Sequence, residues 1–388
     1  MDRPPLIGRI AAPRQRSGIC LNMIVKDEAP VIGRALDSVR EVIECYRIVD
    51  TGSTDGTPEA ILAIMDTHGV PGEVHFRPWV DFGHNRQQAL DLVYADASTA
   101  WALFIDADEE LGYRDPAFYR DLQAGTSYDL EKRYGNLAYR VPHLINIANA
   151  RWSWHGPVHE YLAVEGNPPR RFLAGVWIQV HPGEGSRSRG LSPRQKFLRD
   201  AELLETALQR DPQNARNRFY LAQSYRDAGM PEKAYLNYHL RSLMPGWVEE
   251  SYLAQLEKAR LMIALKMPHG EILAAFLQAH EMRPGRAEAL WHLASYCRLR
   301  QNHAQAYLFA RAGAAIPLPE DRLFVRQDVY RWRLLDEWAI SAYWTGRYRE
   351  SAEVSRRLLA EGHHDPRDTP RLQANLRFAL AKLTPGGA

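Results

Sequence analysis

The sequence has little of the material that defines several protein classes. Its three cysteines, Cys20, Cys45 and Cys297, are too few and too scattered for a disulfide framework or a zinc site. We therefore expect buried thiols in a reducing compartment. No apolar run approaches the roughly 20 residues that span a membrane, and the N-terminus has no apolar signal segment. We expect a cytoplasmic protein without an integral membrane segment.

Excess charge is also absent. The formal net charge is +2, which argues against a nucleic-acid binder, since such proteins carry a concentrated basic stripe. The 388 residues include only seven lysines against 42 arginines, and we interpret this imbalance as a GC-rich coding bias rather than a functional signal. A chain of this length has room for two domains, each with its own core.

The first half of the chain alternates apolar segments with helical patterns. Apolar segments cover residues 19–25, 45–50 and 101–105, and the first two are followed by apolar residues at helical spacing. Strand and helix in alternation predict an α/β domain with a mainly parallel, Rossmann-like sheet.

Acidic residues stand where these apolar segments end. Asp50 closes the second segment, and Asp106 and Asp108 follow the third. Alternate residues of a strand share a face, so Asp106 and Asp108 would present hard oxygens on one side, where a divalent cation can also bind phosphate. Ligands of open α/β sheets bind at these carboxyl ends. Ordinary polar turns are the alternative interpretation.

The second half of the chain predicts helices only, in repeated pairs. Leu221, Ala222 and Ala234 have counterparts of the same type 72 residues later, which fits two repeats of about 36 residues. This is close to the ~34-residue period of the tetratricopeptide repeat. A less regular pair lies between them, a fourth follows, and a helix over residues 371–382 would cap the stack. Such solenoids bind peptide or protein on the concave side. A buttressing or dimer-forming role is equally open.

Three motifs in order carry a resemblance to a known family. They are Met23-Ile-Val-Lys-Asp-Glu28, Val49-Asp-Thr-Gly-Ser-Thr-Asp-Gly-Thr57 and Phe104-Ile-Asp-Ala-Asp-Glu109. Residues 18–185 resemble an inverting glycosyltransferase of family 2 with the GT-A fold. Its fusion to tetratricopeptide-like repeats is similar to a bacterial subgroup that includes the sublancin-type peptide S-glycosyltransferases. We expect an N-terminal extension (1–17), the GT-A domain (18–185), a linker or lid (186–195) and the repeat domain (196–388).

The resemblance implies a nucleotide-sugar site and a metal. Asp50 would accept a hydrogen bond from the base, typically uracil, Asp106 would lie beside the ribose, and Asp108 would bind Mn²⁺ or Mg²⁺ through the diphosphate. His181 is a second metal-ligand candidate, against a purely structural histidine. The residues expected to contact the nucleotide-sugar are Val25, Lys26, Glu28, Asp50, Arg86, Asp106, Ala107 and Asp108.

The acceptor side is predicted from the segment around His155-Gly-Pro-Val-His159-Glu160, which resembles the Gly-x-Val-His-Glu of the same subgroup. The spacing of His155 and His159 would suit zinc on a helix, but the intervening glycine and proline disfavour a helix, so we reject that site. Inverting transfer needs a base, for which Glu160 is the first candidate and His159 the second. Further candidates are Arg187 and Arg189 as a diphosphate lid, against a solvated linker, and Trp152 and Trp154 as sugar-stacking or core aromatics.

The predicted function is metal-dependent, inverting transfer of a sugar from a nucleotide-sugar, expected to be UDP-linked, to a peptide or protein side chain presented by the repeats. A glycan or lipid-linked sugar is the alternative acceptor. A nucleotidyltransferase is disfavoured because the loop after Val25 is acidic and lacks glycine. A repeat-based adaptor with an inactive domain is the other rival class. The identity of the sugar, the acceptor atom and a homo-oligomeric state stay open.

Overall fold

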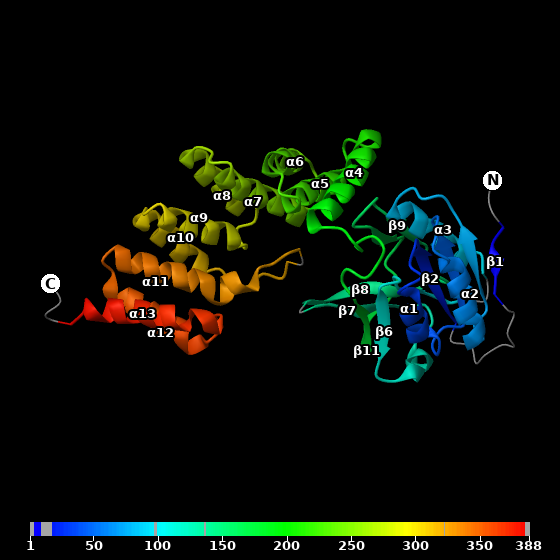
Figure 1. Ribbon diagram of the computed structural model, residues 1–388. Helices are drawn as coiled ribbons and strands as arrows, with labels where there is room; N and C mark the ends of the chain where they lie inside the picture. Colours follow the sequence, from blue (N-terminus) through cyan, green and yellow to red (C-terminus); the bar gives the residue numbers. More distant parts are fainter. Residues whose placement is uncertain (1–3, 9–17, 97–98, 136, 322, 385–388) are drawn as a thin grey trace. The chain divides into compact units, whose positions relative to one another are not determined.

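The computed structural model describes residues 4–8, 18–96, 99–135, 137–321 and 323–384. The chain divides into two compact units, residues 1–207 and 208–388 (Figure 1). The first unit extends further than the expected GT-A domain, because it includes the predicted linker and most of the following helix, α4 (Pro193–Arg210). Residues 1–3 and 9–17 of the predicted N-terminal extension lie outside the described residues.

The first unit is built on a mixed sheet with the order β1-β4-β3-β2-β5-β8-β7-β11-β6. Strands β4, β3, β2 and β5 are parallel neighbours, whereas β8 runs antiparallel to both β5 and β7. A separate hairpin pairs β9 with β10. The strands are β1 (Leu6–Ile7), β2 (Ile19–Val25), β3 (Cys45–Asp50), β4 (Gly72–Phe76), β5 (Trp101–Phe104), β6 (Glu109–Tyr113), β7 (Ser127–Tyr134), β8 (Leu137–Asn146), β9 (Trp152–His155), β10 (Tyr161–Val164) and β11 (Arg170–Val180).

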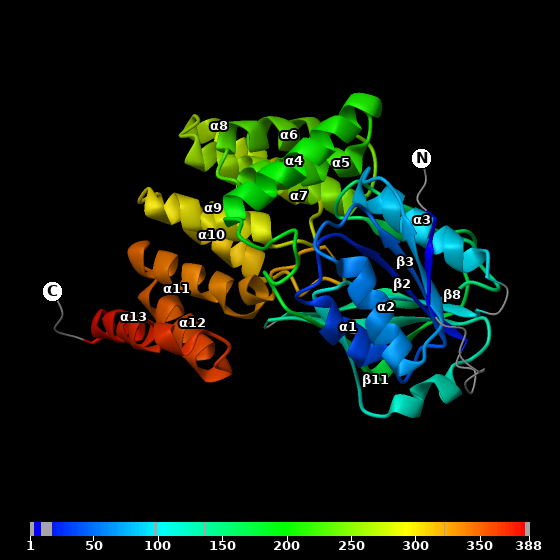
Figure 2. The same cartoon turned by 45° about the vertical axis from the view of Figure 1, so that its right-hand side comes forward.

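Helices cover both faces of this sheet, because alternate residues of its strands are apolar on either side. Ile19, Leu21 and Met23 of β2 share one core with α1 (Ile32–Val39) and α2 (Thr57–His68), which Figure 2 shows together in front of the sheet. Cys20 belongs to the opposite core, with α3 (Phe82–Tyr94). A short 3₁₀ helix spans Pro116–Asp121. The predicted α/β class with a largely parallel sheet is confirmed.

The loops that follow β2, β3 and β5 meet at one edge of the sheet, since the three strands are parallel and adjacent. Val25 is paired with Asp50, and the backbone N–H of Thr51 donates to the carbonyl of Val25 at 2.9 Å. The acidic turn after β5 therefore lies beside the loop that follows β2, as expected for the ligand edge of such a sheet.

The second unit consists of helices that pack against their neighbours along the chain. The predicted pairs are confirmed, and small residues such as Ala222, Ala234 and Ala294 are fully buried where the helices approach. The helices are α5 (Ala215–Asp227), α6 (Pro231–Leu243), α7 (Val248–Ala264), α8 (His269–Met282), α9 (Glu288–Leu299), α10 (His303–Ala314), α11 (Leu334–Trp344), α12 (Tyr348–Glu361) and α13 (Thr369–Ala381), with a π-helical turn at Val329–Arg333 and a 3₁₀ turn at Pro366–Asp368. Within the described residues, no helix is long and apolar enough to cross a membrane.

Candidate active site

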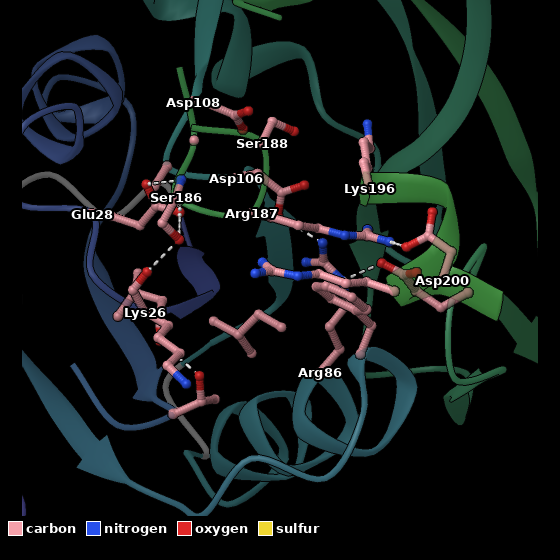
Figure 3. Close-up of a pocket in the computed structure, with 18 of the residues that line it drawn as sticks. Lys26, Glu28, Arg86, Asp106, Asp108, Ser186, Arg187, Ser188, Lys196 and Asp200 are labelled. Atoms are coloured by element: carbon pink, nitrogen blue, oxygen red, sulfur yellow. Dashed lines mark hydrogen bonds and ion pairs between the residues drawn. The ribbon is translucent and has the colours of Figure 1, made fainter. Parts of the chain in front are cut away.

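A cavity of about 940 Å³ opens at the ligand edge of the first unit. Figure 3 shows how acidic and basic side chains converge on it from several elements. Half of the residues that line it are charged. Seven of the eight predicted nucleotide-sugar residues are among its lining: Val25, Lys26, Glu28, Arg86, Asp106, Ala107 and Asp108.

Arg86 of α3 links the two predicted halves of the site. Its Nη2 donates to Asp106 Oδ1 at 2.7 Å, and its Nε donates to Glu160 Oε1 at 2.8 Å. Burial works against ionisation of Asp106, but the charges of Arg86 and Lys132 outweigh it and lower the pKa of Asp106 to about 2. Asp106 is therefore a permanent anion beside a permanent cation, and Glu160 faces the same cavity.

A close backbone approach sets the position of Glu160. The N–H of Gly83, in the first turn of α3, donates to the carbonyl of Gly156 at 3.1 Å, and a Cβ at Gly83 would lie 2.3 Å from that oxygen. Glycine at 83 thus lets the loop before β10 dock on α3, one turn from Arg86. His159 adopts a left-handed φ of 53° and is not among the described residues that line the cavity. His155 ends β9 and residues 157–159 form a bend, so the two histidines do not lie on a helix.

Asp108 lies where a divalent cation is predicted. Burial and the neighbouring charge of Asp106 raise the pKa of its carboxyl group, so a cation here would relieve a real repulsion. The loop after β11 packs close by, because a Cβ at Gly185 would lie 2.8 Å from Asp108 Oδ2. Magnesium is often held by one or two carboxylates together with substrate phosphates, and the pair Asp106 and Asp108 fits that pattern.

The His181 side chain is hydrogen-bonded to a carboxylate in this structure. Its Nε2 lies 2.6 Å from Glu110 Oε2, while only its backbone N–H reaches Asp108, by donating to the carbonyl oxygen at 3.0 Å. The described part of the chain contains no group of three or more His, Cys, Asp or Glu side chains arranged to hold an ion. A metal role for His181 stays a prediction. The contact with Glu110 is the kind of hydrogen bond that a purely structural histidine would make.

The loop after β11 is tied down over the loop after β2. Ser186 donates from its N–H to Glu28 Oε2 at 3.0 Å and from its hydroxyl to the carbonyl of Lys26 at 2.6 Å (Figure 3). Burial raises the pKa of Glu28, and the hydrogen bonds from Ser186 act against that rise. These bonds hold the start of the predicted linker or lid segment against the loop after β2.

The two lid arginines differ from each other in position. Arg187 lines the cavity, but its guanidinium is bonded to Asp200 of α4 and lies 4.3 Å from the centre of the Phe82 ring. Arg189 donates to the carbonyl of Glu184 at 2.8 Å and is not among the described lining residues. Both side chains have protein partners here, and Arg189 is also exposed to solvent, so the choice between a lid and a solvated linker stays a prediction.

Asp50 and Trp152 make contacts within the protein rather than lining the cavity. Asp50 is 2 % exposed and accepts hydrogen bonds from the backbone N–H groups of Gly52 and Ser53, so its carboxylate organises its own loop and does not line the cavity. Trp152 is 1 % exposed, and its indole N–H donates to the carbonyl of Asn146, which makes it a core residue rather than a sugar platform.

Trp154 is partly buried and packs against the same core as Trp152. It stands edge-on to Phe104 with ring centroids 5.1 Å apart, and the Arg86 guanidinium lies 5.3 Å from its ring centre. Its role in this structure is to support Arg86 from outside the cavity lining.

Several residues that line the cavity were not predicted from the sequence. Lys132 and Tyr134 of β7, Tyr139 of β8 and Lys196 of α4 all line it. Lysine scarcity was the overlooked signal: the first unit contains three lysines, Lys26, Lys132 and Lys196, and all three line the cavity. The scarcity of lysine indicates no function by itself. The position of all three lysines of the first unit at one cavity does indicate one.

Comparison with known proteins now identifies the first unit. Residues 20–115, which include β2, β3, β5 and the acidic turn, match the model of Glycosyl transferase family 2. The chain carries a family 2 glycosyltransferase domain. Helical pairs with a tetratricopeptide-like repeat follow that domain in the second unit.

Three curated proteins are similar to parts of this chain. The lipopolysaccharide core biosynthesis glycosyltransferase LpsC of Rhizobium meliloti is 28% identical over 163 residues, covering 38% of this chain and 56% of LpsC. An uncharacterized glycosyltransferase of Rickettsia felis is 34% identical, covering 32% and 38%. The TPR repeat-containing protein Synpcc7942_0270 of Synechococcus elongatus is 39% identical, covering 24% and 21%. The chain thus spans about half or less of the length of these relatives.

Proposed function

We propose that the first unit transfers a sugar from a nucleotide-sugar, expected to be UDP-linked, to an acceptor with inversion at the anomeric carbon. The observation that carries this proposal is the meeting of Asp106, Asp108 and Glu160 around Arg86 and its cavity, at the carboxyl ends of parallel strands. The family 2 match over residues 20–115 supports the reaction class.

The proposed chemistry is a single displacement. The acceptor's nucleophilic atom attacks the anomeric carbon while the bond from that carbon to the diphosphate oxygen breaks. The electron pair leaves with the diphosphate, and the acceptor proton passes to a carboxylate oxygen of Glu160. Arg86 holds Glu160 at 2.8 Å and thereby fixes where the proton is taken, since its second bond to Asp106 prevents rotation of the guanidinium.

Charge on the leaving diphosphate needs compensation within the cavity. A divalent cation bound at Asp108 would supply it when present, as the family resemblance implies. Lys196 supplies a fixed positive charge: it lines the cavity, it acts electrostatically on Asp108, and no ion pair to its amine is found among the described residues. Arg187 and Arg189 are engaged elsewhere, so we assign to Lys196 the contact that the sequence suggested for the arginines.

The acceptor predicted from the sequence is a peptide or protein side chain presented by the helical unit, with a glycan as the alternative. An adaptor that only binds nucleotide is disfavoured by the set of charged groups, because Asp106, Asp108, Arg86 and Glu160 all converge on one cavity. Pure binding would not require a carboxylate beside the site of attack.

Nucleotide binding tests the donor half of the proposal. We expect UDP, with Mg²⁺ or Mn²⁺, to raise the melting temperature of the wild type by a few degrees at about 100 times its Kd. Asp108→Ala should lose the metal-dependent part of this shift. Asp121→Ala is the matched control, since Asp121 is an exposed acid outside the cavity. The absence of a shift with every nucleoside diphosphate would rule out the donor site.

The base is tested separately with Glu160→Gln. Glutamine keeps the shape and can still accept from Arg86 Nε, but it cannot take a proton. We expect UDP affinity to be kept while turnover of the nucleotide-sugar falls by roughly 100-fold or more. Turnover close to that of the wild type would remove Glu160 from the mechanism and leave the donor site intact.

A further inference from the structure

Two tyrosines of the β7–β8 hairpin face the cavity without an evident role in the fold. Tyr134 and Tyr139 are 44% and 48% exposed, and both line the cavity. Tyr139 is paired across the hairpin with Lys132, and Lys132 shares a strand face with Tyr134 two residues later. The two rings and the lysine therefore stand on the same face of the hairpin, toward the site.

These half-exposed rings differ from the other aromatic pair of the cavity in having no aromatic partner among the described residues. Trp79 and Phe82 pack edge to face with centroids 4.8 Å apart, and Phe82 also carries the guanidinium of Arg187. Across the described residues, neither Tyr134 nor Tyr139 has a ring or a guanidinium stacked on it. Large aromatic side chains left half exposed inside a polar cavity are typical of a binding surface.

Hydrogen-bonding groups adjoin these rings. Lys132 Nζ lies 2.6 Å from Glu109 Oε1, so a donor and an acceptor are held together on the same side of the cavity. Burial and the charge of Asp106 raise the pKa of Glu109 despite this ion pair. An aromatic face beside fixed polar groups matches a pyranose ring, which has an apolar face of C–H groups and a rim of hydroxyls.

A peptide side chain fits this surface less well. Half of the residues that line the cavity are charged. Binding of an apolar side chain would leave buried charges without partners, which is costly. A polyhydroxylated ligand can satisfy them.

We propose that Tyr134 and Tyr139 form an acceptor platform on which a pyranose ring stacks, so that the acceptor of this glycosyltransferase domain is a carbohydrate. The inference rests on the proposed function, because it takes the remaining part of the same cavity as the place of the donor. It selects the glycan alternative over the peptide side chain predicted from the sequence.

Saturation-transfer NMR with the full chain and saturating UDP tests the platform. The probes are methyl glucoside, methyl galactoside and methyl N-acetylglucosaminide, alongside a blocked serine- and cysteine-containing peptide. We expect transfer from protein to the ring protons of at least one glycoside and none to the peptide. Tyr134→Ala and Tyr139→Ala should each weaken glycoside binding roughly two- to tenfold, and the double variant should abolish the signal.

Conservative variants separate stacking from structural damage. Tyr134→Phe and Tyr139→Phe keep the ring and should keep the signal, as should Phe172→Ala, which removes an aromatic of similar exposure outside the cavity. Glycoside signals unaffected by the double alanine variant, or absent from the wild type, overturn the platform. Peptide signals lost in that variant would assign the surface to a peptide instead.

UDP affinity of each variant is measured in the same samples. Unchanged UDP binding with no glycoside signal rejects the platform while the donor site stands. If UDP fails to bind the wild type, the proposed function and the platform fail together.

Discussion

The two units use buried charge in opposite ways. In the helical unit, Arg286 is 1 % exposed and is neutralised by Glu288 at 2.8 Å and Asp321 at 3.2 Å, so that the charges link helices and loops. In the glycosyltransferase unit, Asp108 stands beside another carboxylate and Lys196 lines the cavity without an ion pair among the described residues. Charged groups that neutralise one another hold the fold together. Charged groups that lack a partner are suited to bind a charged ligand.

Removing Asp108 should give the largest functional effect at no cost in stability. Asp108→Asn keeps the shape but removes an anion whose pKa is raised by burial and by Asp106. We expect turnover to fall on the order of 100-fold or more, while the free energy of unfolding of the first unit is unchanged or higher. Nucleotide-sugar turnover and urea unfolding measure the two quantities. A strongly destabilised variant would show that Asp108 is a structural residue.

The opposite result is expected in the helical unit. Arg286→Met leaves the buried Glu288 carboxylate without its arginine, while Asp321 keeps its ion pair with Arg283. The substitution should cost about 3–5 kcal/mol of unfolding free energy. Nucleotide-sugar hydrolysis by the first unit should persist. Arg367→Met is the matched control, because the Arg367 side chain is 90% exposed and its ion pair with Asp365 lies in solvent, where such pairs contribute little to stability. Equal effects of the two substitutions would contradict the comparison.

Gly83 connects backbone packing to Glu160, the proposed base. In Gly83→Ala the new Cβ would meet the carbonyl oxygen of Gly156 at 2.3 Å, so the loop carrying Glu160 must shift. We expect a loss of about 1–3 kcal/mol and a clear loss of turnover. Gly33→Ala in α1 is the control, since its Cβ would lie 3.7 Å from Ile64 and should stabilise the helix by up to about 1 kcal/mol. Calorimetry and turnover are the measurements, and normal activity of Gly83→Ala would refute the coupling.

Substitution of Lys196 tests whether its positive charge contributes to binding of the nucleotide-sugar. Lys196→Ala should weaken UDP binding roughly tenfold, the usual loss for one charge-assisted contact, while Lys196→Arg should restore most of it. Arg194→Ala removes an exposed cation of the same helix that does not line the cavity and should change nothing. Titration calorimetry gives the affinities. If both alanine variants bind UDP alike, Lys196 has no part in the donor site.

The smallest effect concerns pH and should be common to both units. Burial lowers the pKa of His143 to about 3, with Lys132 adding to the shift, and burial does the same for His292, with Arg260 adding. Both folded-state values lie below the unfolded value of about 6.5. Their contribution to stability is therefore complete above pH 6.5 and is lost as the pH falls toward 3.

Urea midpoints at pH 7 and 5 measure this dependence. His143→Gln should flatten the transition of the first unit and His292→Gln that of the second. A pH dependence unchanged by either substitution would show that these histidines are not responsible.

Much of the fold was predictable because its signals are local. The strand of residues 19–25 alternates its apolar residues between two cores, and the acidic turn at Asp106 and Asp108 directly follows an apolar strand. The helical pairs were predicted because buried alanines recur at a fixed interval. The place of Glu160 in the cavity was also predicted, through the family resemblance rather than through its local pattern.

The rest depended on contacts between distant segments. The pattern around Trp152 and Trp154 is equally compatible with a core and with a sugar platform, and only packing on α3 and β5 decides between them. Asp50 and Asp106 both stand where an apolar strand gives way to a loop. The Asp50 carboxylate accepts hydrogen bonds from its own loop, whereas the Asp106 carboxylate contacts Arg86. Tyr134, Tyr139 and Lys196 carry no motif, so their role became visible only in the cavity.

The sequence by itself determined that a parallel α/β domain precedes helical repeats and that acids gather at one edge of its sheet, because periodicity and strand direction are properties of short segments. Tertiary structure alone decided which charges stay unpaired. The loop after β11 folds back onto the loop after β2, 158 residues away between Ser186 and Glu28, and the β7–β8 hairpin brings two tyrosines to the same cavity. Such distances are set by the packing of whole elements, which no local pattern encodes.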